Sequence, residues 1–298
     1  MKFQTLSLVT GTAACNASCP FCVSKMTYDD NITYKQTPIN FRNFDKTLRL
    51  AQIGNVSTVI FTGKGEPFLY PQQLVDYLEF MQKNNYTFPF MEIQTNGELL
   101  THNTIGEYDV DKVLKRLYDL GVTSILVSNV GPNAELNRQI YYPRKNAMYN
   151  MQYLVDKVQK FGINVRLTTV GIKGGVDSVA ELDKLVEWAK FLGVKQLTWR
   201  PVNEPGTNYN LNDEVSCWVK NNHLSTLKVE EIVDHVAHYG SLIYKLVHGA
   251  AVYDYKGMNL CLTNSLTQDP AGEVVRQLIF YPDGSLYTDW AKKGSVLL

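Results

Sequence analysis

Residues 110–128, VDKVLKRLYDLGVTSILVS, decide how we interpret the fold. The first part of this stretch has apolar residues at three- and four-residue steps, which is typical of one face of an amphipathic helix. These residues are Val110, Val113, Leu114 and Leu117. Gly121 follows, and glycine commonly ends a helix in the left-handed conformation. Residues 123–128 are rich in β-branched side chains and predict a strand, so the stretch indicates a helix that turns back into a sheet.

The same unit repeats along the chain. The predicted strands are residues 3–10, 56–62, 90–95, 123–128, 164–170 and 196–200. Helical apolar patterns lie between them, and four of these helices are followed by glycine, at Gly54, Gly121, Gly162 and Gly193. Alternating strands and helices predict a parallel sheet with right-handed crossovers. Six units are too few for a closed eight-unit barrel, so we expect an α/β fold with a partial (β/α)6 barrel over residues 5–203.

A different pattern follows this core. Residues 203–213 have the composition of a loop. Residues 228–247 predict one amphipathic helix, and residues 277–290, QLIFYPDGSLYTDW, predict a hairpin around a Pro-Asp-Gly turn. We interpret residues 204–298 as a small α+β C-terminal extension that packs on the barrel.

Composition excludes several classes of protein. The 298 residues are 45% hydrophobic, which is enough for a sizeable core. They contain no apolar run of membrane-spanning length and no signal-peptide pattern, so we expect a cytoplasmic protein without a membrane partner. The formal net charge is zero and no basic block is present, which argues against a nucleic-acid partner.

Three of the five cysteines lie within residues 15–22, CNASCPFC. Thiolates bind iron–sulfur clusters, zinc or copper(I). A structural zinc site takes four ligands and no fourth lies nearby in the sequence, whereas a [4Fe–4S] cluster held by three thiolates keeps one iron open. We interpret Cys15, Cys19 and Cys22 as the ligands of such a cluster, with a zinc site as the alternative.

The C-x3-C-x-aromatic-C pattern after a first strand resembles the radical S-adenosylmethionine (SAM) superfamily. The resemblance covers roughly residues 5–203. It implies that the amino and carboxylate groups of SAM chelate the open iron and that one electron from the cluster breaks the S–C5′ bond. A 5′-deoxyadenosyl radical then abstracts hydrogen from a substrate. The resemblance also implies an electron donor such as flavodoxin or ferredoxin, and it places Phe21 beside the adenine.

Residues 61–67, FTGKGEP, resemble the family's G-G-E-P segment, which binds the SAM amino group. By this resemblance Gly63 and Gly65 let backbone carbonyls approach SAM, and Glu66 accepts hydrogen bonds from its ammonium. Lys64 departs from the pattern because the family has a glycine there. An ordinary strand-to-helix turn is the alternative for this segment taken alone.

Later strand ends supply further candidates by the same resemblance. These are Asn96 in QTNG, Ser128 for the ribose or carboxylate, Arg166 for the carboxylate, Ile172 behind the adenine, and the backbone of Arg200 and Val202 at the adenine edge. A turn residue is the alternative for Asn96, and an arginine that faces solvent or plugs a barrel end is the alternative for Arg166.

The sequence favours a small-molecule or nucleotide substrate. A peptide-modifying enzyme and a glycyl-radical activase come second and third, and RNA modification comes last because of the charge. A zinc- or cluster-binding scaffold or redox sensor is the non-enzyme alternative, which SAM binding would distinguish. Cys217 and Cys261 are too few for an auxiliary cluster, and we expect both to be small buried side chains.

Overall fold

The computed structural model describes residues 2–26, 35–142, 150–203, 214–246, 248–263, 274–290 and 293–298. Its main feature is an eleven-stranded sheet. In spatial order the strands are β13 (Leu286–Tyr287), β12 (Val274–Phe280), β1 (Lys2–Val9), β2 (Thr58–Thr62), β3 (Phe90–Thr95), β6 (Ser124–Asn129), β7 (Asn164–Gly171), β8 (Gln196–Pro201), β11 (Met258–Leu262), β10 (Ala251–Tyr255) and β9 (Ser241–Lys245).

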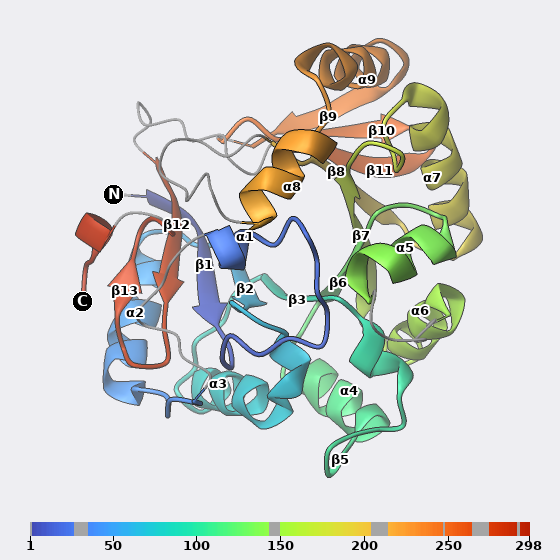
Figure 1. Cartoon of the computed structure of the whole chain (residues 1–298). Helices are drawn as coiled ribbons and strands as arrows, with labels where there is room; N and C mark the ends of the chain where they lie inside the picture. Colours follow the sequence, from blue (N-terminus) through green and yellow to red (C-terminus); the bar gives the residue numbers. More distant parts are fainter. Residues whose placement is uncertain are drawn as a thin grey trace.

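Six of these strands, β1, β2, β3, β6, β7 and β8, are neighbours in chain order and all pair in parallel. Helices connect them on the outer side of the curved sheet (Figure 1). The helices are α2 (Phe41–Ile53), α3 (Pro71–Lys83), α4 (Val110–Asp119), α5 (Ala134–Tyr141), α6 (Met151–Gln159) and α7 (Val179–Phe191). The predicted partial (β/α)6 barrel with parallel strands is therefore confirmed.

The stretch that decided the interpretation folds as expected. The Asp109 side chain accepts a hydrogen bond from the Lys112 N–H at 2.9 Å and so caps the first turn of α4. Gly121 has a φ of +93°, a left-handed conformation that other residues rarely adopt. The chain then enters β6, whose residues pair with β3 on one side and β7 on the other.

Alternation along the strands separates two environments. In β8, Leu197 and Trp199 are buried in the main apolar core beneath the outer helices. Because successive side chains of a strand point to opposite faces, Thr198 and Arg200 face the interior of the barrel. The same alternation places Arg166 and Thr168 of β7 on the interior face. The outer face therefore stabilises the fold, and the inner face carries polar groups.

The C-terminal part corrects one prediction. The helix expected over residues 228–247 is wrong at its C-terminal end, because α9 (Thr226–Tyr239) stops before Gly240 and residues 241–245 form β9. This segment, SLIYK, contains residues that favour strands, and its backbone pairs antiparallel with β10. Val247 lies outside the described residues. The predicted hairpin is confirmed, since β12 and β13 pair antiparallel through Ile279 and Tyr287.

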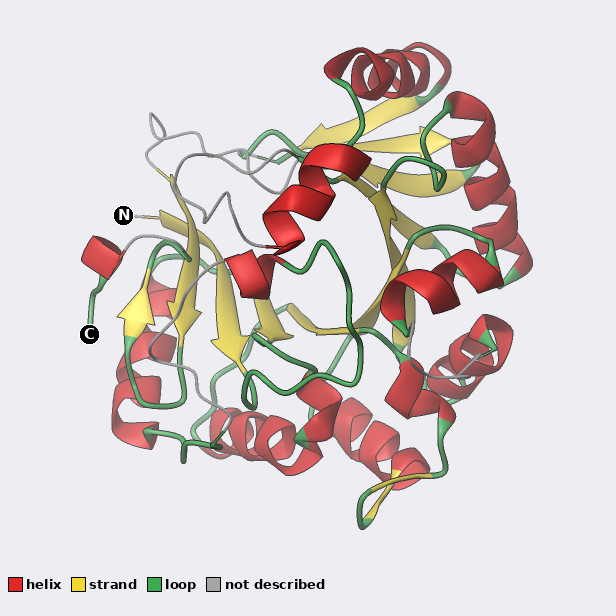
Figure 2. Cartoon of the chain, viewed as in Figure 1, coloured by secondary structure: helices red, strands yellow, loops and turns green. Residues whose placement is uncertain are grey.

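Two C-terminal strands extend the parallel sheet at its two ends. β11 pairs parallel to β8, and β12 pairs parallel to β1. The spatial order ends at β13 and β9, so among the described strands the barrel stays open, and Figure 2 shows the strands as an arc with loops inside it. The division at residue 204 remains an interpretation, because both parts of the chain share one sheet.

Short elements lie at the mouth of the arc. α1 (Val23–Met26) contacts α8 (Glu214–Asn222), and Figure 1 shows both in front of the strands. The remaining small elements are β4 (Thr104–Ile105), β5 (Tyr108–Asp109), η1 (Pro67–Leu69), η2 (Glu98–Thr101) and η3 (Lys293–Ser295). None of the helices in the described ranges is long and apolar enough to cross a membrane.

Candidate active site

The predicted cluster ligands lie on the loop between β1 and α1. Cys15 is exposed, whereas Cys19 and Cys22 are partly buried. The Cys22 N–H donates to the Cys19 carbonyl at 3.3 Å, and the Ala17 N–H donates to the Cys15 Sγ at 3.4 Å. The loop thus folds into turns around its own sulfur atoms.

The thiols influence one another electrostatically. Although the Cys15 residue is exposed as a whole, the protein atoms packed around its thiol, followed by the negative charges of Glu66 and Cys22, raise the pKa of Cys15 to about 11. Burial, followed by the charges of Cys22 and Cys15, also raises the pKa of Cys19. Three ionised thiolates are therefore costly together unless a cation neutralises them, which is the role of the irons in a cluster.

No three His, Cys, Asp or Glu side chains of the described residues are arranged to hold a single metal ion. In a [4Fe–4S] site each thiolate binds a different iron, so its cysteines do not converge on one ion. Three soft donors on one loop, coupled by charge and without a fourth metal-binding side chain grouped with them in the described ranges, fit the cluster chemistry.

The loop after β2 packs directly against the cysteine loop. A Cβ atom on Gly65 would lie 1.9 Å from the Ala14 carbonyl oxygen, and one on Gly63 would lie 2.8 Å from the Thr10 carbonyl oxygen. The Glu66 N–H donates to the Ala14 carbonyl at 3.0 Å. Both glycines are therefore required for this close approach, whatever else the loop binds.

Glu66 is 2% exposed and lies between the loop after β2 and the loop after β3. Its Oε1 accepts from the Thr95 hydroxyl at 2.6 Å, and its Oε2 accepts from the Asn96 N–H at 2.9 Å. Burial raises the pKa of Glu66 to about 7, although its hydrogen bonds oppose this shift. An ammonium group placed beside this carboxylate would favour its ionised form.

Asn96 connects the loop after β3 to the loop between β1 and α1 that carries the cysteines. Its Nδ2 donates to the Asn16 Oδ1 at 2.7 Å and lies 3.8 Å from the Cys15 Sγ. Its Oδ1 accepts from the Tyr142 hydroxyl at 2.8 Å. Asn16 in turn donates to the buried Glu98 at 2.6 Å. The structure thus places Asn96 against a predicted cluster ligand, where it orients the loop and the sulfur.

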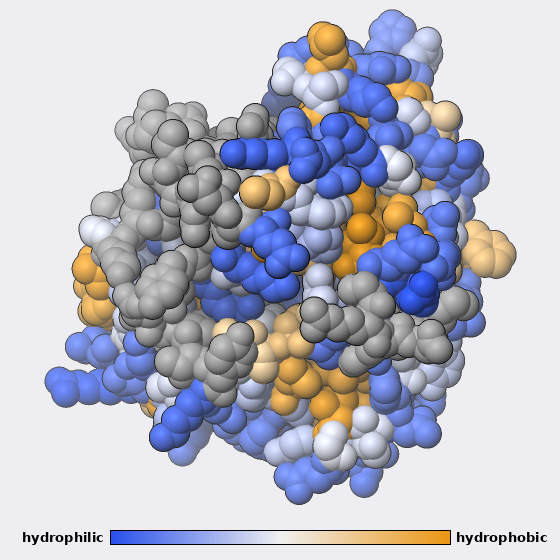
Figure 3. Space-filling view, in the orientation of Figure 1, coloured by the Kyte–Doolittle hydropathy of each residue, from blue (hydrophilic) through white to orange (hydrophobic). Residues whose placement is uncertain are grey.

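Three predicted adenine contacts meet in one apolar cluster. Phe21, Ile172 and Val202 pack there with Cys19 and with residues that the sequence analysis missed, Tyr141 and Trp218. The Phe21 ring lies 6.0 Å from Tyr141 and 5.8 Å from Trp218, measured between ring centroids. Figure 3 shows apolar surface between the polar side chains over α8 and α5 on this face.

Arg166 was expected to bind the carboxylate of SAM, but it has a carboxylate partner within the chain. Its Nη2 lies 3.0 Å from the Glu92 Oε1, and its Nε and Nη2 donate to the Gln196 Oε1. This pairing, near the N-terminal end of β7, supports the alternative of an arginine that plugs a barrel end. Ser128 is partly exposed on β6, in register with Thr168 of β7.

Lys64 is 8% exposed, and its Nζ lies 5.7 Å from the centroid of the Trp290 ring. Trp290 also packs edge-on against Tyr281, which follows β12. Lys64, which replaces a family glycine, thus connects the loop after β2 to the segment that follows the C-terminal hairpin. Cation–π attraction stabilises this contact.

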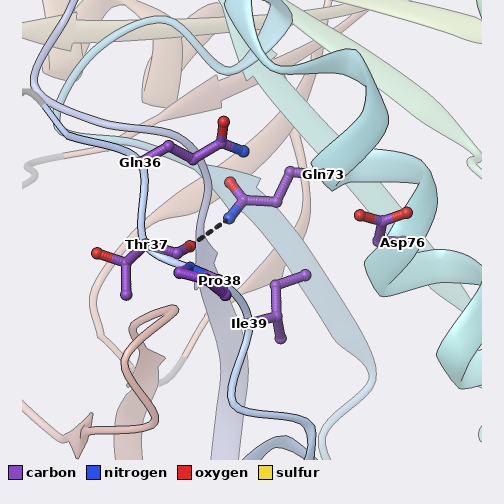
Figure 4. Close-up of a pocket in the computed structure, with 6 residues that line it drawn as sticks. All are labelled: Gln36, Thr37, Pro38, Ile39, Gln73 and Asp76. Atoms are coloured by element: carbon purple, nitrogen blue, oxygen red, sulfur yellow. Dashed lines mark hydrogen bonds between the residues drawn. The ribbon is translucent and has the colours of Figure 1, made fainter.

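A hollow beside the cysteine loop is lined by Gln36, Thr37, Pro38, Ile39, Gln73 and Asp76 (Figure 4). Gln73 is 2% exposed, accepts from the Gly11 N–H at 2.5 Å and donates to the Thr37 carbonyl at 3.4 Å. None of the predicted site residues lines this hollow. Gln73 therefore supports the start of the cysteine loop from behind.

Two predictions about the remaining cysteines meet different outcomes. Cys261 is partly buried on β11, whereas Cys217 is exposed on α8, so the expectation of a buried side chain is wrong for Cys217. The following residue, Trp218, faces the apolar cluster instead. No helix or strand was predicted over residues 214–222, and only the fold brings Trp218 to Phe21.

Comparisons with known proteins agree with this geometry. Residues 9–199 match the family model of the radical SAM superfamily. Two curated relatives, from Chlorobium luteolum and Pelodictyon phaeoclathratiforme, are probable dual-specificity RNA methyltransferases RlmN, each 22% identical to this chain. The first match covers 65% of this chain and 54% of the relative, and the second covers 61% and 50%. The chain thus matches about half the length of these relatives.

Solved structures show the same fold at low identity. A structure of anSMEcpe with bound AdoMet covers 97% of this chain and 75% of its own, with 16% identity and a TM-score of 0.57. A radical SAM methyltransferase from Sphaerobacter thermophilus covers 87% and 66%, with 15% identity and a TM-score of 0.55. Because the family match spans well over half of the chain, this protein belongs to the radical SAM superfamily of enzymes, whose cofactors are a [4Fe–4S] cluster and SAM.

Proposed function

We propose that the protein cleaves SAM reductively and uses the resulting 5′-deoxyadenosyl radical to abstract hydrogen from a small-molecule or nucleotide substrate. The observation that carries this proposal is the meeting of three loops at one edge of the sheet. Gly65 packs on the cysteine loop, Glu66 bonds to the third loop, and Asn96 returns to Cys15. Cluster ligands and SAM-binding groups would thus share one rigid frame.

The residues of the chain have distinct tasks in this proposal. Cys15, Cys19 and Cys22 hold the cluster, which with SAM supplies the one-electron bond cleavage. Glu66 would bind the SAM ammonium, and backbone carbonyls around Gly63 and Gly65 would accept from the same group. The apolar cluster of Phe21, Ile172 and Val202 encloses the adenine and excludes water, which protects a radical from stray hydrogen donors.

Ser128 and Arg166 remain candidates for the polar groups of SAM. Ser128 lies on β6 in register with Thr168, is partly exposed, and would donate to the ribose or the carboxylate. Arg166 would have to share its guanidinium with Glu92, which makes it the weaker candidate of the two. An electron donor such as flavodoxin or ferredoxin would reduce the cluster, and a cytoplasmic location would keep its thiols reduced.

RNA is the second candidate substrate. The sequence analysis argued against nucleic acid from the net charge, and the RNA methyltransferase relatives leave that argument without support. Membership of the superfamily fits a small-molecule substrate and an RNA substrate equally well. The substrate must therefore be identified by product analysis. A methylated nucleotide in total RNA treated with the enzyme and SAM would favour RNA over a small molecule.

The test is an anaerobic assay with the reconstituted protein, SAM and a strong one-electron reductant, in which 5′-deoxyadenosine is quantified by mass spectrometry. Wild type is expected to produce it, and Cys19→Ala is not. Cys217→Ala is the matched control, because this exposed thiol lies outside the loop. Equal yields from wild type and Cys19→Ala, or none from fully loaded wild type with substrate extracts, would contradict the proposal.

A further inference from the structure

Arg200 was expected to contribute its backbone at the adenine edge, and its side chain has no role in the site described above. It lies on the inward face of β8, where Val170 of β7 is its register partner. Val170 belongs to the apolar cluster of Phe21 and Ile172, and Val202 follows two residues later in the chain. The Arg200 side chain therefore starts beside the proposed adenine pocket, on the face where a substrate would lie.

The surroundings of Arg200 are unusual for a cation. Its Nε is shut off from solvent and has no hydrogen-bond partner among the described residues. A buried donor without a partner costs about 1–3 kcal/mol, and more when it is charged. Arg166 on the neighbouring strand shows the ordinary solution, since it is ion-paired with Glu92 at 3.0 Å.

The titratable groups around Arg200 that the structure describes are cationic or neutral. Burial and the charge of Arg276 lower the pKa of Arg200. Burial, followed by the charges of Arg276 and Arg200, lowers the pKa of His248 to about 4, so this imidazole is neutral near pH 7. The His248 Nδ1 lies 2.8 Å from the Gln4 Oε1, which fixes the ring between the β9–β10 turn and β1.

The electrostatic contacts of Arg200 include no carboxylate among the residues that the structure describes; they are with Arg276 and the Cys261 thiol. Cys261 pairs in register with Thr198, so it faces the same interior as Arg200. Arg276 lies on β12, which pairs with β1 at the other end of the row of parallel strands from β8. The inner face of β8 thus carries, beside the apolar cluster, a guanidinium whose buried Nε has no hydrogen-bond partner among the described residues.

We propose that Arg200 binds an oxyanion of the substrate, a carboxylate or a phosphate, at the interior face that β8 shares with β11. The guanidinium of arginine presents paired donors that match both oxyanions. The proposal rests on the proposed function, because it names the substrate class of the same site. It restricts the substrate to small anionic molecules that fit inside the barrel.

The experiment measures the thermal midpoint of the cluster-loaded protein at constant ionic strength with increasing inorganic phosphate or succinate. A ligand that binds only the folded state raises the midpoint as its concentration rises. Wild type is expected to respond to at least one of the two probes, which also distinguishes phosphate from carboxylate recognition. Arg200→Gln is expected to lose at least about tenfold in apparent affinity for that probe.

Two further variants separate binding from a structural role. Arg116→Gln removes an exposed arginine paired with Glu79 and is expected to keep the wild-type response. Arg200→Lys keeps the charge without the paired donors and is expected to respond weakly. Without probe, Arg200→Gln is expected to melt at or above the wild-type midpoint, since an unsatisfied buried donor is removed.

The outcomes are distinct. Equal responses of wild type and Arg200→Gln, no response to either probe, or a lower midpoint of Arg200→Gln without probe would each overturn the oxyanion site. The same preparations are assayed for 5′-deoxyadenosine. A probe response without 5′-deoxyadenosine contradicts the proposed function alone, and 5′-deoxyadenosine without a probe response contradicts the oxyanion site alone.

Discussion

At the scale of single residues, the site combines groups that the sequence identifies with groups that only the fold supplies. Cys15, Cys19 and Cys22 stand out because few chemistries use this spacing of thiols. Asn96 was proposed from a short motif, and the structure adds its contact with Cys15. Tyr142 and Trp218 belong to no motif, because their contribution depends on where the chain returns after long intervals.

Glu66 carries a prediction about pH. Its pKa is raised from 4.5 to about 7, so between these values the folded chain binds more protons than the unfolded chain. The contribution of Glu66 to stability is therefore largest below pH 4.5 and is lost as the pH rises to about 7. The difference in unfolding free energy between cluster-free wild type and Glu66→Gln should shift against wild type by up to roughly 3 kcal/mol from pH 5 to pH 8. A difference that stays constant with pH would contradict this account.

Asn96 carries a prediction about the cluster. Hydrogen bonds to cluster sulfurs stabilise the reduced, more negative form. Asn96→Ala should therefore lower the midpoint potential by roughly 40 mV, which corresponds to one hydrogen bond of about 1 kcal/mol. Tyr142→Phe, which removes a bond one step further from the sulfur, should shift the potential less. Redox titration followed by EPR measures both, and an unchanged potential in Asn96→Ala would show that the contact has no effect on the sulfur.

At the scale of elements, periodicity predicted the six central strands and the helices between them. The prediction failed at residues 241–245, where the apolar pattern of α9 runs on into SLIYK. Local pattern alone could not separate helix from strand there, because the pairing with β10 decides the conformation. The same limit explains why the sequence missed the parallel pairing of β11 with β8 and of β12 with β1.

The loop after β2 provides a prediction at this scale. Gly65→Ala would place a methyl group 1.9 Å from the Ala14 carbonyl oxygen, so the cysteine loop must move. We expect fewer irons per chain after reconstitution and a lower melting temperature. Gly294→Ala is the matched control, because a Cβ there has no neighbour within 4 Å. Full iron loading of Gly65→Ala would show that the close approach of the two loops is not required.

The ion pair between Glu92 of β3 and Arg166 of β7 provides a second prediction at this scale. Arg166→Gln leaves the Glu92 carboxylate, whose side chain is 8% exposed, without its partner. Removing one partner of a buried pair typically costs about 3–5 kcal/mol, and the 27% exposure of the Arg166 side chain favours the lower end. Denaturant unfolding should show this loss, and adding Glu92→Gln should recover most of it. A loss below about 0.5 kcal/mol would assign Arg166 to a role outside the fold.

At the scale of the whole molecule, an open parallel barrel places its chemistry at one edge. The loops after β1, β2 and β3 meet there, and α8 and the C-terminal hairpin approach the same edge from later in the chain. The sequence predicted this edge because parallel strands all end on one side. It did not predict which C-terminal side chains reach it, since Trp218 and Trp290 are placed by packing between distant segments.

The central claim is that three cysteines hold a [4Fe–4S] cluster with one iron open to SAM. The most direct measurement is the EPR spectrum of the reduced, reconstituted protein with and without SAM. We predict a [4Fe–4S] signal that SAM changes in wild type and in a Cys217→Ser, Cys261→Ser double variant, and no such signal in Cys19→Ala. A wild-type cluster signal that SAM leaves unchanged, or an intact signal in Cys19→Ala, would contradict the account.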